Sequence, residues 1–177
     1  IAQSGEQKSL TGQTAPNWAL KTSDGKFEFL NNYVAPFGME LLNDEQERKI
    51  VIQSFFASWC GPCIKEIGEL EKVKKTYAGK PVQFFLINLT DYFRKEESKK
   101  YRDAPNAMEL LKEKGLTNIA VLEDNRGIVA RQYNVANVLP RLFVIDKYQT
   151  VQMDTLGLCP NCIQDEVGAA LDRLMEE

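Results

Sequence analysis

Two long apolar runs dominate the hydrophobic pattern of the chain. Ile50–Phe56 reads IVIQSFF and Val82–Leu89 reads VQFFLINL, so hydrophobic side chains occupy most positions of both runs. Runs rich in β-branched and aromatic residues are typical of central strands that are buried on both faces. Shorter strand-like pieces, Trp18–Lys21 and Phe27–Leu30, flank the turn signal Ser23-Asp24-Gly25, which predicts a hairpin near the N-terminus.

Helical periodicity follows the first long run. After Cys60 the apolar residues recur at intervals of three and four, which places them on one helix face, and Gly79-Lys80-Pro81 ends the pattern. A second helix is predicted around Ala107–Leu111, before Gly115, and a third from Ile163 to Leu174.

The remaining segments complete an alternation of strands and helices. They are a short strand-like IAVL at residues 119–122, the turn EDNRG, and the pieces RLFVID and VQMDTL on either side of Lys147–Thr150. The last two predict an antiparallel hairpin. The alternation favours an α/β layer fold with crossover connections, and the hairpin makes its central sheet mixed. With 177 residues the chain is long enough to form one domain with a real core.

Charge and composition narrow the classes of function. The chain has 22 Lys and Arg against 25 Asp and Glu, a formal net charge of −3, and no basic block outside mixed-sign stretches. Nucleic acid is therefore not expected as a partner. The stretch RKEESKKYR from Arg94 to Arg102 is interpreted as a solvated helix face, with a binding role as the alternative. No apolar run reaches about 18 residues, so no membrane span is predicted.

Histidine is absent from the sequence. Its absence excludes Cys-His and Ser-His nucleophile pairs, imidazole bases and His-ligated metals, so any chemistry must use cysteine and carboxylate. The polar start IAQSGEQKS begins at Ile1 without a signal segment, which fits either the mature form of an exported protein or a trimmed chain. Membrane anchoring is expected only through a removed N-terminal segment, if at all.

All four cysteines occur as C-x-x-C pairs, Cys60/Cys63 and Cys159/Cys162. The pairs permit an oxidising compartment but do not require one. The first pair, in SFFASWCGPCIKEI, has three interpretations: a metal half-site, a structural clasp or a working redox pair. About 95 residues separate the two pairs, whereas zinc ribbons use roughly 15–20. A ribbon is therefore disfavoured, although a composed four-thiolate site remains open.

The redox interpretation has a direct physical basis at Cys60, where a strand ends and a helix begins. The unpaired N–H groups and dipole of a helix N-terminus lower the pKa of a thiol placed there, and the thiolate is the attacking species. Pro62 suits a first helical turn, and Gly61 leaves the sulfur accessible. Cys63, one turn into the helix, is expected to be less exposed and to resolve a mixed disulfide.

The motif FFASWCGPC resembles the thioredoxin superfamily, whose W-C-G-P-C active site lies at this strand–helix joint. Further features resemble the extracytoplasmic TlpA-like thiol–disulfide oxidoreductases: GQTAPNWALKTSDGKF near the N-terminus, Glu66 three residues after the second cysteine, a helical insert after Leu89, and LEDNRGIVARQYNVANVLPRLFVID leading into Pro140. The resemblance covers about residues 10–177. It implies a thioredoxin fold over residues 1–177, with an N-terminal β extension (1–48), a core (49–177) and an insert at about 91–117.

The resemblance also assigns roles to residues. It makes Cys60 the nucleophile, Cys63 the resolving thiol and Pro140 a cis-proline facing the sulfurs, and it gives the backbone of Leu139 the task of pairing with a substrate strand. Gly61 and Pro62 belong to the same substrate-facing surface.

Two further residues carry both a functional and an ordinary interpretation. Trp59 either shapes the surface beside Cys60 or is an aromatic residue packed on the end of the sheet. Glu66 lies on the same helix face as Cys63. There it either handles the proton of Cys63 with a raised pKa or is a solvated helix residue.

Three positions depart from the family pattern. Ser54 stands where cytosolic thioredoxins have a buried Asp, so that proton acceptor is missing. Arg141 follows the proline where Thr or Ser is common; it either stabilises a thiolate, selects acidic partners or points to solvent. Cys159 and Cys162 form a second pair that the family pattern lacks. Because the last hairpin returns toward the active-site edge, this pair is expected there as a disulfide, either a structural staple or a second redox pair.

The leading hypothesis is a thiol–disulfide oxidoreductase that reduces disulfides of exported proteins through Cys60 and Cys63. It uses no cofactor or metal beyond its own redox-active disulfide. Its expected partners are disulfide-containing client proteins and a membrane or soluble thiol donor, and its expected location is periplasmic or otherwise extracytoplasmic. The alternatives are a binding module of the same fold with structural disulfides, and a four-thiolate metal protein.

Overall fold

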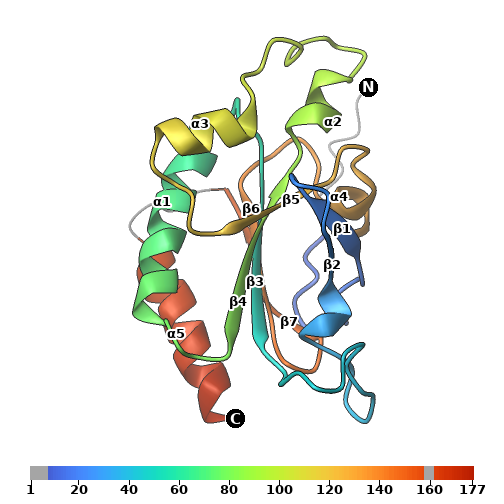
Figure 1. Cartoon of the computed structure of the whole chain (residues 1–177), viewed down its shortest axis with the longest axis vertical. Helices are drawn as coiled ribbons and strands as arrows, with labels where there is room; N and C mark the ends of the chain where they lie inside the picture. Colours follow the sequence, from blue (N-terminus) through green and yellow to red (C-terminus); the bar gives the residue numbers. More distant parts are fainter. Residues whose placement is uncertain (1–7, 158–161) are drawn as a thin grey trace.

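A single seven-stranded sheet organises the chain. The computed structural model describes residues 8–157 and 162–177 (Figure 1). Across the sheet the strands follow the order β2-β1-β5-β4-β3-β6-β7. They are β1 (Ala19–Thr22), β2 (Phe27–Phe29), β3 (Ile50–Phe56), β4 (Val82–Asn88), β5 (Ala120–Glu123), β6 (Arg141–Ile145) and β7 (Val151–Leu156).

The sheet is mixed, as the sequence predicts. Strands β3, β4 and β5 run parallel to one another, whereas β6, β7, β1 and β2 pair antiparallel to their neighbours. Parallel neighbours require crossover connections. The helix α1 (Gly61–Thr76) lies on the crossover from β3 to β4, and the helices α2 (Thr90–Arg94) and α3 (Ala107–Glu113) lie on the one from β4 to β5. The helix α4 (Ile128–Gln132) precedes β6, α5 (Ile163–Glu176) follows the last strand, and a short 3-10 helix spans Leu30–Asn32.

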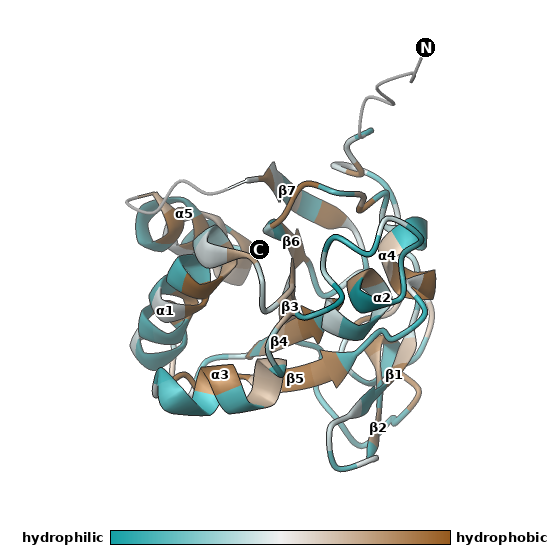
Figure 2. Ribbon diagram, turned by 90° about the horizontal axis from the view of Figure 1, so that it is seen from above, coloured by the Kyte–Doolittle hydropathy of each residue, from teal (hydrophilic) through white to brown (hydrophobic). Residues whose placement is uncertain are grey.

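Helices cover both faces of the sheet. In the view from above, α1, α3 and α5 lie on one side and α4 lies on the other (Figure 2). All seven residues of β3 are buried, and successive side chains point to opposite faces. Ser54 therefore faces α1, where it meets Glu66, while its neighbour Gln53 meets Trp18 on the opposite face.

Helix α5 is fastened to α1 by side chains as well as by apolar packing. The Tyr77 hydroxyl, just after α1, contacts the Gly168 carbonyl at 3.0 Å and the Asp172 carboxylate at 2.7 Å. Gln164 donates to Glu69 at the other end of the contact. These bonds fix the C-terminal helix beside the helix that carries the first cysteine pair. Within the described residues, no helix has the length and apolar character needed to cross a membrane.

The structure corrects the sequence analysis at two segments. The stretch Arg94–Arg102 is not a helix face: α2 ends at Arg94, and turns follow it. The turn predicted at EDNRG leads directly into α4, which was not predicted. The side chain of Asp124 caps the N-terminus of α4, because its carboxylate accepts hydrogen bonds from the N–H groups of Ile128 and Ala130 at 3.0 and 2.8 Å.

Candidate active site

The first cysteine pair lies at the joint between β3 and α1, as the sequence predicts. Cys60 is the N-cap of α1, and its sulfur accepts a hydrogen bond from the N–H of Cys63 at 3.2 Å. The two sulfurs form a disulfide, and Pro62 occupies the first turn without needing a donor there. The N–H of Cys63 and the dipole of α1 are thus directed at the Cys60 sulfur, which favours its thiolate once the disulfide is reduced.

Both cysteines are enclosed in this oxidised state. Cys60 is 3% exposed and Cys63 is fully buried. The order of exposure agrees with the prediction that Cys63 is the more protected thiol.

Glu66 is a buried carboxylic acid one turn after Cys63. Its side chain is fully buried, and the Ser54 hydroxyl donates to Oε1 at 2.5 Å. Oε2 is buried without a hydrogen-bond partner among the described residues. Burial raises the pKa of Glu66 from 4.5 to about 7, and the Ser54 hydrogen bond opposes only part of that rise. The interpretation of Glu66 as a solvated helix residue is therefore wrong.

The bond between Glu66 and Ser54 also explains a departure from the family pattern. Ser54 replaces a buried acid of cytosolic thioredoxins, but here a carboxyl group reaches the same strand position from α1. The sequence analysis named both residues without pairing them, because twelve positions separate them. A polar side chain within a central strand, here Ser54, indicates a polar partner on the helix that covers it, and that helix carries Glu66.

Pro140 follows a cis peptide bond from Leu139, so the predicted bond geometry is confirmed. Pro140 immediately precedes β6, and Arg141 pairs with Phe55 of β3. This register brings Pro140 level with the end of β3, beside the segment that leads to Cys60. Within the described part of the chain, the Leu139 backbone N–H and carbonyl have no hydrogen-bond partner. Leu139 itself is 8% exposed, and its pairing with a substrate strand stays a prediction.

Arg141 does not point to solvent. It is 2% exposed, and its Nε and Nη2 donate to the Asp154 carboxylate at 2.5 and 2.8 Å. Asp154 also accepts from the N–H of Leu10, so the pair ties the N-terminal segment to β6 and β7. The solvent-directed interpretation of Arg141 is wrong. Its selection of acidic partners stays a prediction, and would require access to a guanidinium already paired with a buried carboxylate.

Trp59 is covered by an aromatic residue from the insert. Its ring stacks on Tyr101 with centroids 4.0 Å apart and planes 13° apart, and it meets Phe93 edge-on at 5.1 Å. The sequence analysis missed Tyr101 and Phe93 as neighbours of the site. No periodic pattern marks Tyr101, which stands alone within a charged run.

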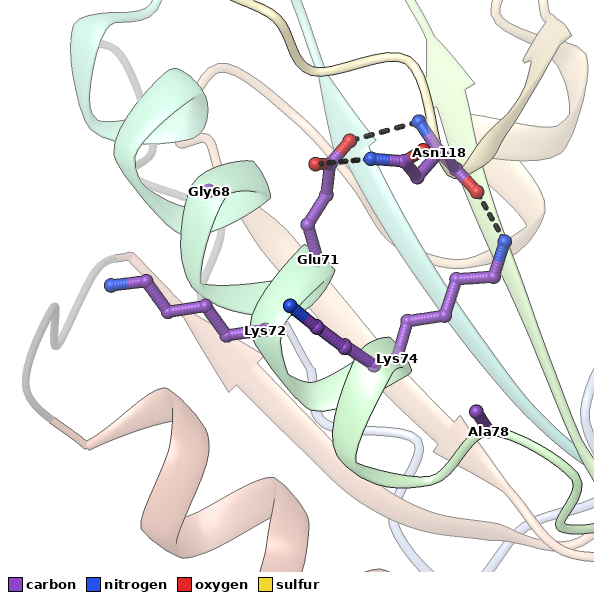
Figure 3. A pocket seen from close by; sticks show the side chains of 7 residues that line it. Gly68, Glu71, Lys72, Lys74, Ala78 and Asn118 are labelled. Carbon is purple, nitrogen blue, oxygen red and sulfur yellow. Dashed lines mark hydrogen bonds between the residues drawn. The ribbon is translucent and has the colours of Figure 1, made fainter.

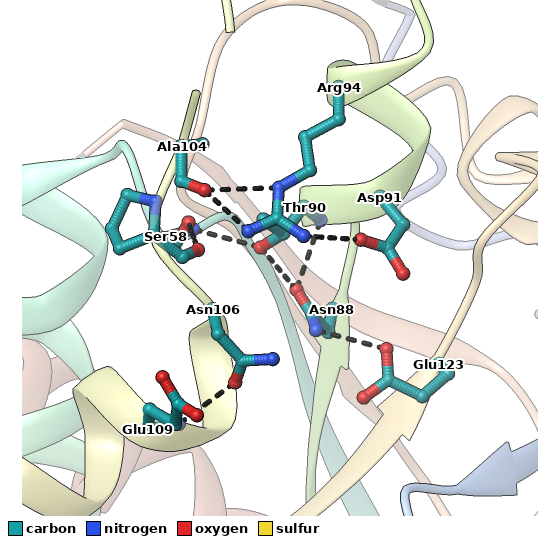
Figure 4. A network of polar contacts seen from close by, with 10 residues as sticks. Ser58, Asn88, Thr90, Asp91, Arg94, Ala104, Asn106, Glu109 and Glu123 are labelled. Carbon is teal, nitrogen blue, oxygen red and sulfur yellow. Dashed lines mark hydrogen bonds and ion pairs between the residues drawn. The ribbon is translucent and has the colours of Figure 1, made fainter. Parts of the chain in front are cut away.

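Hydrogen bonds hold both ends of the loop 90–105, the first part of the insert, against the residue before Trp59 (Figure 4). The N–H of Ser58 donates to Thr90 Oγ1 at 3.0 Å, and its hydroxyl donates to the Pro105 carbonyl at 2.6 Å. Arg94 closes the loop by donating through Nε to the Ala104 carbonyl at 3.0 Å. The insert is therefore fastened two residues away from Cys60.

A second layer of polar contacts fixes the start of the insert to the sheet. The hydroxyl of Thr90 donates to Asn88 Oδ1 at 2.6 Å, and Asn88 Nδ2 donates to Glu123 at 2.9 Å. Burial raises the pKa of Glu123, with Asp91 adding a smaller effect in the same direction. These hydrogen bonds connect β4, β5 and α2.

A hollow of about 640 Å³ lies away from the cysteines, along the second half of α1 (Figure 3). Within it, Glu71 accepts two hydrogen bonds from Asn118, and Lys74 donates to the Asn118 carbonyl. These contacts pin the segment before β5 to α1. The polar side chains that line the hollow therefore have a structural role.

The second cysteine pair is only partly described. Cys162 is the N-cap of α5, and Cys159 lies outside the described residues. The N–H of Gly157 donates to the Pro140 carbonyl at 2.9 Å, so the chain does return to the cis-proline edge as expected. Cys162 is disulfide-bonded, as the sequence analysis expects, whereas its predicted pairing with Cys159 falls outside the described residues.

Comparison with known sequences places the chain in a family. The sequence profile of the AhpC/TSA family matches residues 11–153. The chain belongs to the AhpC/TSA family. This AhpC/TSA family member is 29% identical over 141 residues to the thioredoxin-like protein YneN of Bacillus subtilis (strain 168), a match that covers 80% of this chain and 68% of YneN.

Solved structures show the same fold. A proposed thiol:disulfide interchange protein DsbE from Chlorobium tepidum superimposes with a TM-score of 0.71 at 24% identity, covering 94% of this chain and 99% of that one. StoA from Bacillus subtilis gives 0.59 at 17% identity, covering 86% and 97%. The AhpC/TSA family member therefore has the thioredoxin fold that its sequence resembles.

Proposed function

We propose that the protein is a thiol–disulfide oxidoreductase that reduces disulfides of exported proteins through Cys60 and Cys63. The observation that carries the proposal is the position of the Cys60 sulfur, which caps α1 and is bonded to Cys63. Membership of the AhpC/TSA family and the likeness to thiol–disulfide oxidoreductases support the reaction class.

In the reduced protein, the Cys60 thiolate attacks one sulfur of a client disulfide and expels the other as a thiolate. This step forms a mixed disulfide. Cys63 then loses its proton, attacks the Cys60 sulfur and releases the client's second thiolate. Two electrons pass to the client, and the Cys60–Cys63 disulfide forms. An external thiol donor, membrane-bound or soluble, is the co-reactant that reduces this disulfide again.

Glu66 is the proposed acceptor of the Cys63 proton. It lies one turn from Cys63 on the same helix face, and its pKa of about 7 lets it exchange protons near neutral pH. The Leu139 backbone and the cis-Pro140 edge are the proposed docking strand for the client, with Trp59, Gly61 and Pro62 beside it. No cofactor enters this scheme.

We place the reaction outside the cytoplasm, because the resemblance to the TlpA-like group implies that location. Fractionation of the source cells, with thiols trapped by alkylation before lysis, tests both location and redox state. An extracytoplasmic reductase is expected in the exported fraction with Cys60 and Cys63 largely reduced. Recovery in the cytoplasmic fraction would contradict this part of the proposal.

Reduction of insulin with dithiothreitol as the electron source tests the reaction itself. The wild-type protein should accelerate precipitation of the insulin B chain, whereas Cys60→Ser should abolish the acceleration because no attacking thiolate remains. An inactive wild-type protein would favour the binding module. One equivalent of zinc per chain in the reduced protein would instead favour the four-thiolate metal site.

A further inference from the structure

The tip of the insert has no role in the proposed reaction. This tip, Lys99–Arg102, consists of three cationic residues and Tyr101. The cationic residues of the tip are exposed, and none of them forms an ion pair within the described residues. Glu96, Glu97 and Asp103 flank the tip, so it is a cluster of three positive charges within a mixed-sign stretch, on a chain whose net charge is −3.

Aromatic contacts connect this positive region to Trp59, the residue before Cys60. Lys100 places its ammonium group 5.2 Å from the centroid of the Tyr101 ring, and that ring stacks on Trp59 at 4.0 Å. Trp59 is the residue directly before Cys60. The ammonium group, the phenol ring and the indole thus form three successive layers, and the indole belongs to the residue that precedes the nucleophile in the sequence.

The base of the insert is also restrained. Ser58 binds Thr90 and Pro105, so the loop between these two residues is anchored at both ends. The basic tip is therefore carried by a loop that is held at both ends by the second residue before Cys60. This differs from a long flexible charged loop, whose ordering would cost entropy on binding.

We propose that the insert tip selects clients by charge, binding acidic residues that flank the client's disulfide. Lys99, Lys100 and Arg102 supply the positive charges, and Tyr101 positions them through its stack on Trp59. At about 3.3 Å per residue of an extended strand, the acidic residues are expected within roughly four positions of the client cysteine. The inference rests on the proposed function, because it names the substrate class of the same reaction.

The test compares two disulfide peptides that differ only in their flanks, one with Asp and one with Lys at positions two to four from each cysteine. The wild-type protein should reduce the acidic peptide with a kcat/KM roughly threefold to tenfold higher, the size expected for two or three exposed ion pairs. The preference should shrink at about 0.5 M salt, because screening is then nearly complete within a few ångström.

Charge reversal supplies the decisive variant and its control. Lys100→Glu/Arg102→Glu should abolish or invert the preference. Lys75→Glu/Lys80→Glu changes the net charge equally but alters exposed residues at the far end of α1, and should keep it. Reduction of hydroxyethyl disulfide, which is small and neutral, should stay similar in all three proteins.

The outcomes separate the two proposals. Failure of the wild-type protein to reduce hydroxyethyl disulfide would overturn the proposed function. Normal reduction of it with equal rates on both peptides, or with an equal effect of both double variants, would overturn the role of the insert tip. Binding of the tip to vesicles of anionic phosphatidylglycerol, with no peptide preference, would assign it to a lipid surface and overturn the role as well.

Discussion

At the scale of single residues, Glu66 shows how burial converts an ordinary side chain into a candidate proton acceptor. On an exposed helix face its carboxyl group would ionise well below neutral pH. In the folded protein Glu66 faces β3, where one carboxyl oxygen accepts a hydrogen bond from Ser54 and the other has no hydrogen-bond partner among the described residues. Burial there raises its pKa, so the carboxyl group retains its proton up to about pH 7. The sequence locates Glu66 on the face of Cys63, but only the packing against Ser54 decides between the two interpretations.

Glu66→Gln should therefore slow resolution of the mixed disulfide and remove the part of the pH–rate profile that rises near pH 7. The amide cannot accept the Cys63 proton, while Ser54 can still donate to its carbonyl oxygen. Single-turnover release of client from Cys60 measures this step. Glu69→Gln, on the same helix, is the control and should leave the profile unchanged. An unchanged profile in Glu66→Gln would remove Glu66 from the mechanism.

The same residue links stability to pH. Between pH 4.5 and about 7 the folded protein keeps a proton on Glu66 that the unfolded chain has lost, so this group's contribution to stability declines as pH rises through that window. Relative to the wild type, Glu66→Gln should gain stability from pH 5 to pH 8 by up to roughly 3 kcal/mol. Urea unfolding of both proteins at the two pH values checks the sign; a relative loss would contradict the raised pKa.

At the scale of elements, the insert and the last hairpin both converge on the active-site edge. The insert is attached through Ser58 and Trp59, and β7 returns to Pro140 through Gly157.

Tyr101→Ala should expose one face of Trp59, shift tryptophan emission to the red and lower stability by about 1 kcal/mol, since an aromatic pair contributes roughly 0.5–1.5 kcal/mol beyond its burial. Tyr101→Phe keeps the ring and should behave as the wild type. Equal emission in the two variants would mean that the stack is not formed in solution.

The second cysteine pair belongs to the same scale, because it precedes α5 at the end of the returning hairpin. If it staples the chain there, Cys159→Ser/Cys162→Ser should lower the melting temperature and leave both turnover and the potential of Cys60–Cys63 unchanged. Slower turnover at unaltered stability would favour electron exchange between the pairs. Calorimetry and redox titration against glutathione separate the two results.

At the scale of the whole molecule, one buried ion pair joins segments that are distant in sequence. Arg141 and Asp154 are 2% and 1% exposed, and the same carboxylate holds Leu10. Asp154→Asn should destabilise the protein by about 3–5 kcal/mol, because it removes the negative charge that is paired with a buried guanidinium. Replacing both partners, as in Arg141→Met/Asp154→Leu, should cost less. Chemical denaturation of the two variants measures the difference; a smaller loss in the single variant would contradict the buried pairing.

Sequence reasoning succeeds where local pattern and burial coincide. The bounds of β3 and β7 were predicted residue for residue, since a continuous apolar run and a flanking turn each mark a strand. It fails where a contact links distant positions. Asp124 starts α4 from upstream, Tyr101 reaches Trp59 from a charged run, and Arg141 finds Asp154 on the adjacent strand. None of these pairings leaves a periodic signal.

The central claim is that Cys60 attacks the client and Cys63 resolves the product. Its most direct test is the covalent intermediate formed by Cys63→Ser with a disulfide-bonded client, located by peptide mass spectrometry after acid quenching. We predict one client thiol per chain, attached at Cys60, and no adduct in Cys60→Ser. A stable adduct at Cys159 or Cys162 instead, or none at all with a client that the wild-type protein reduces, would contradict the assignment.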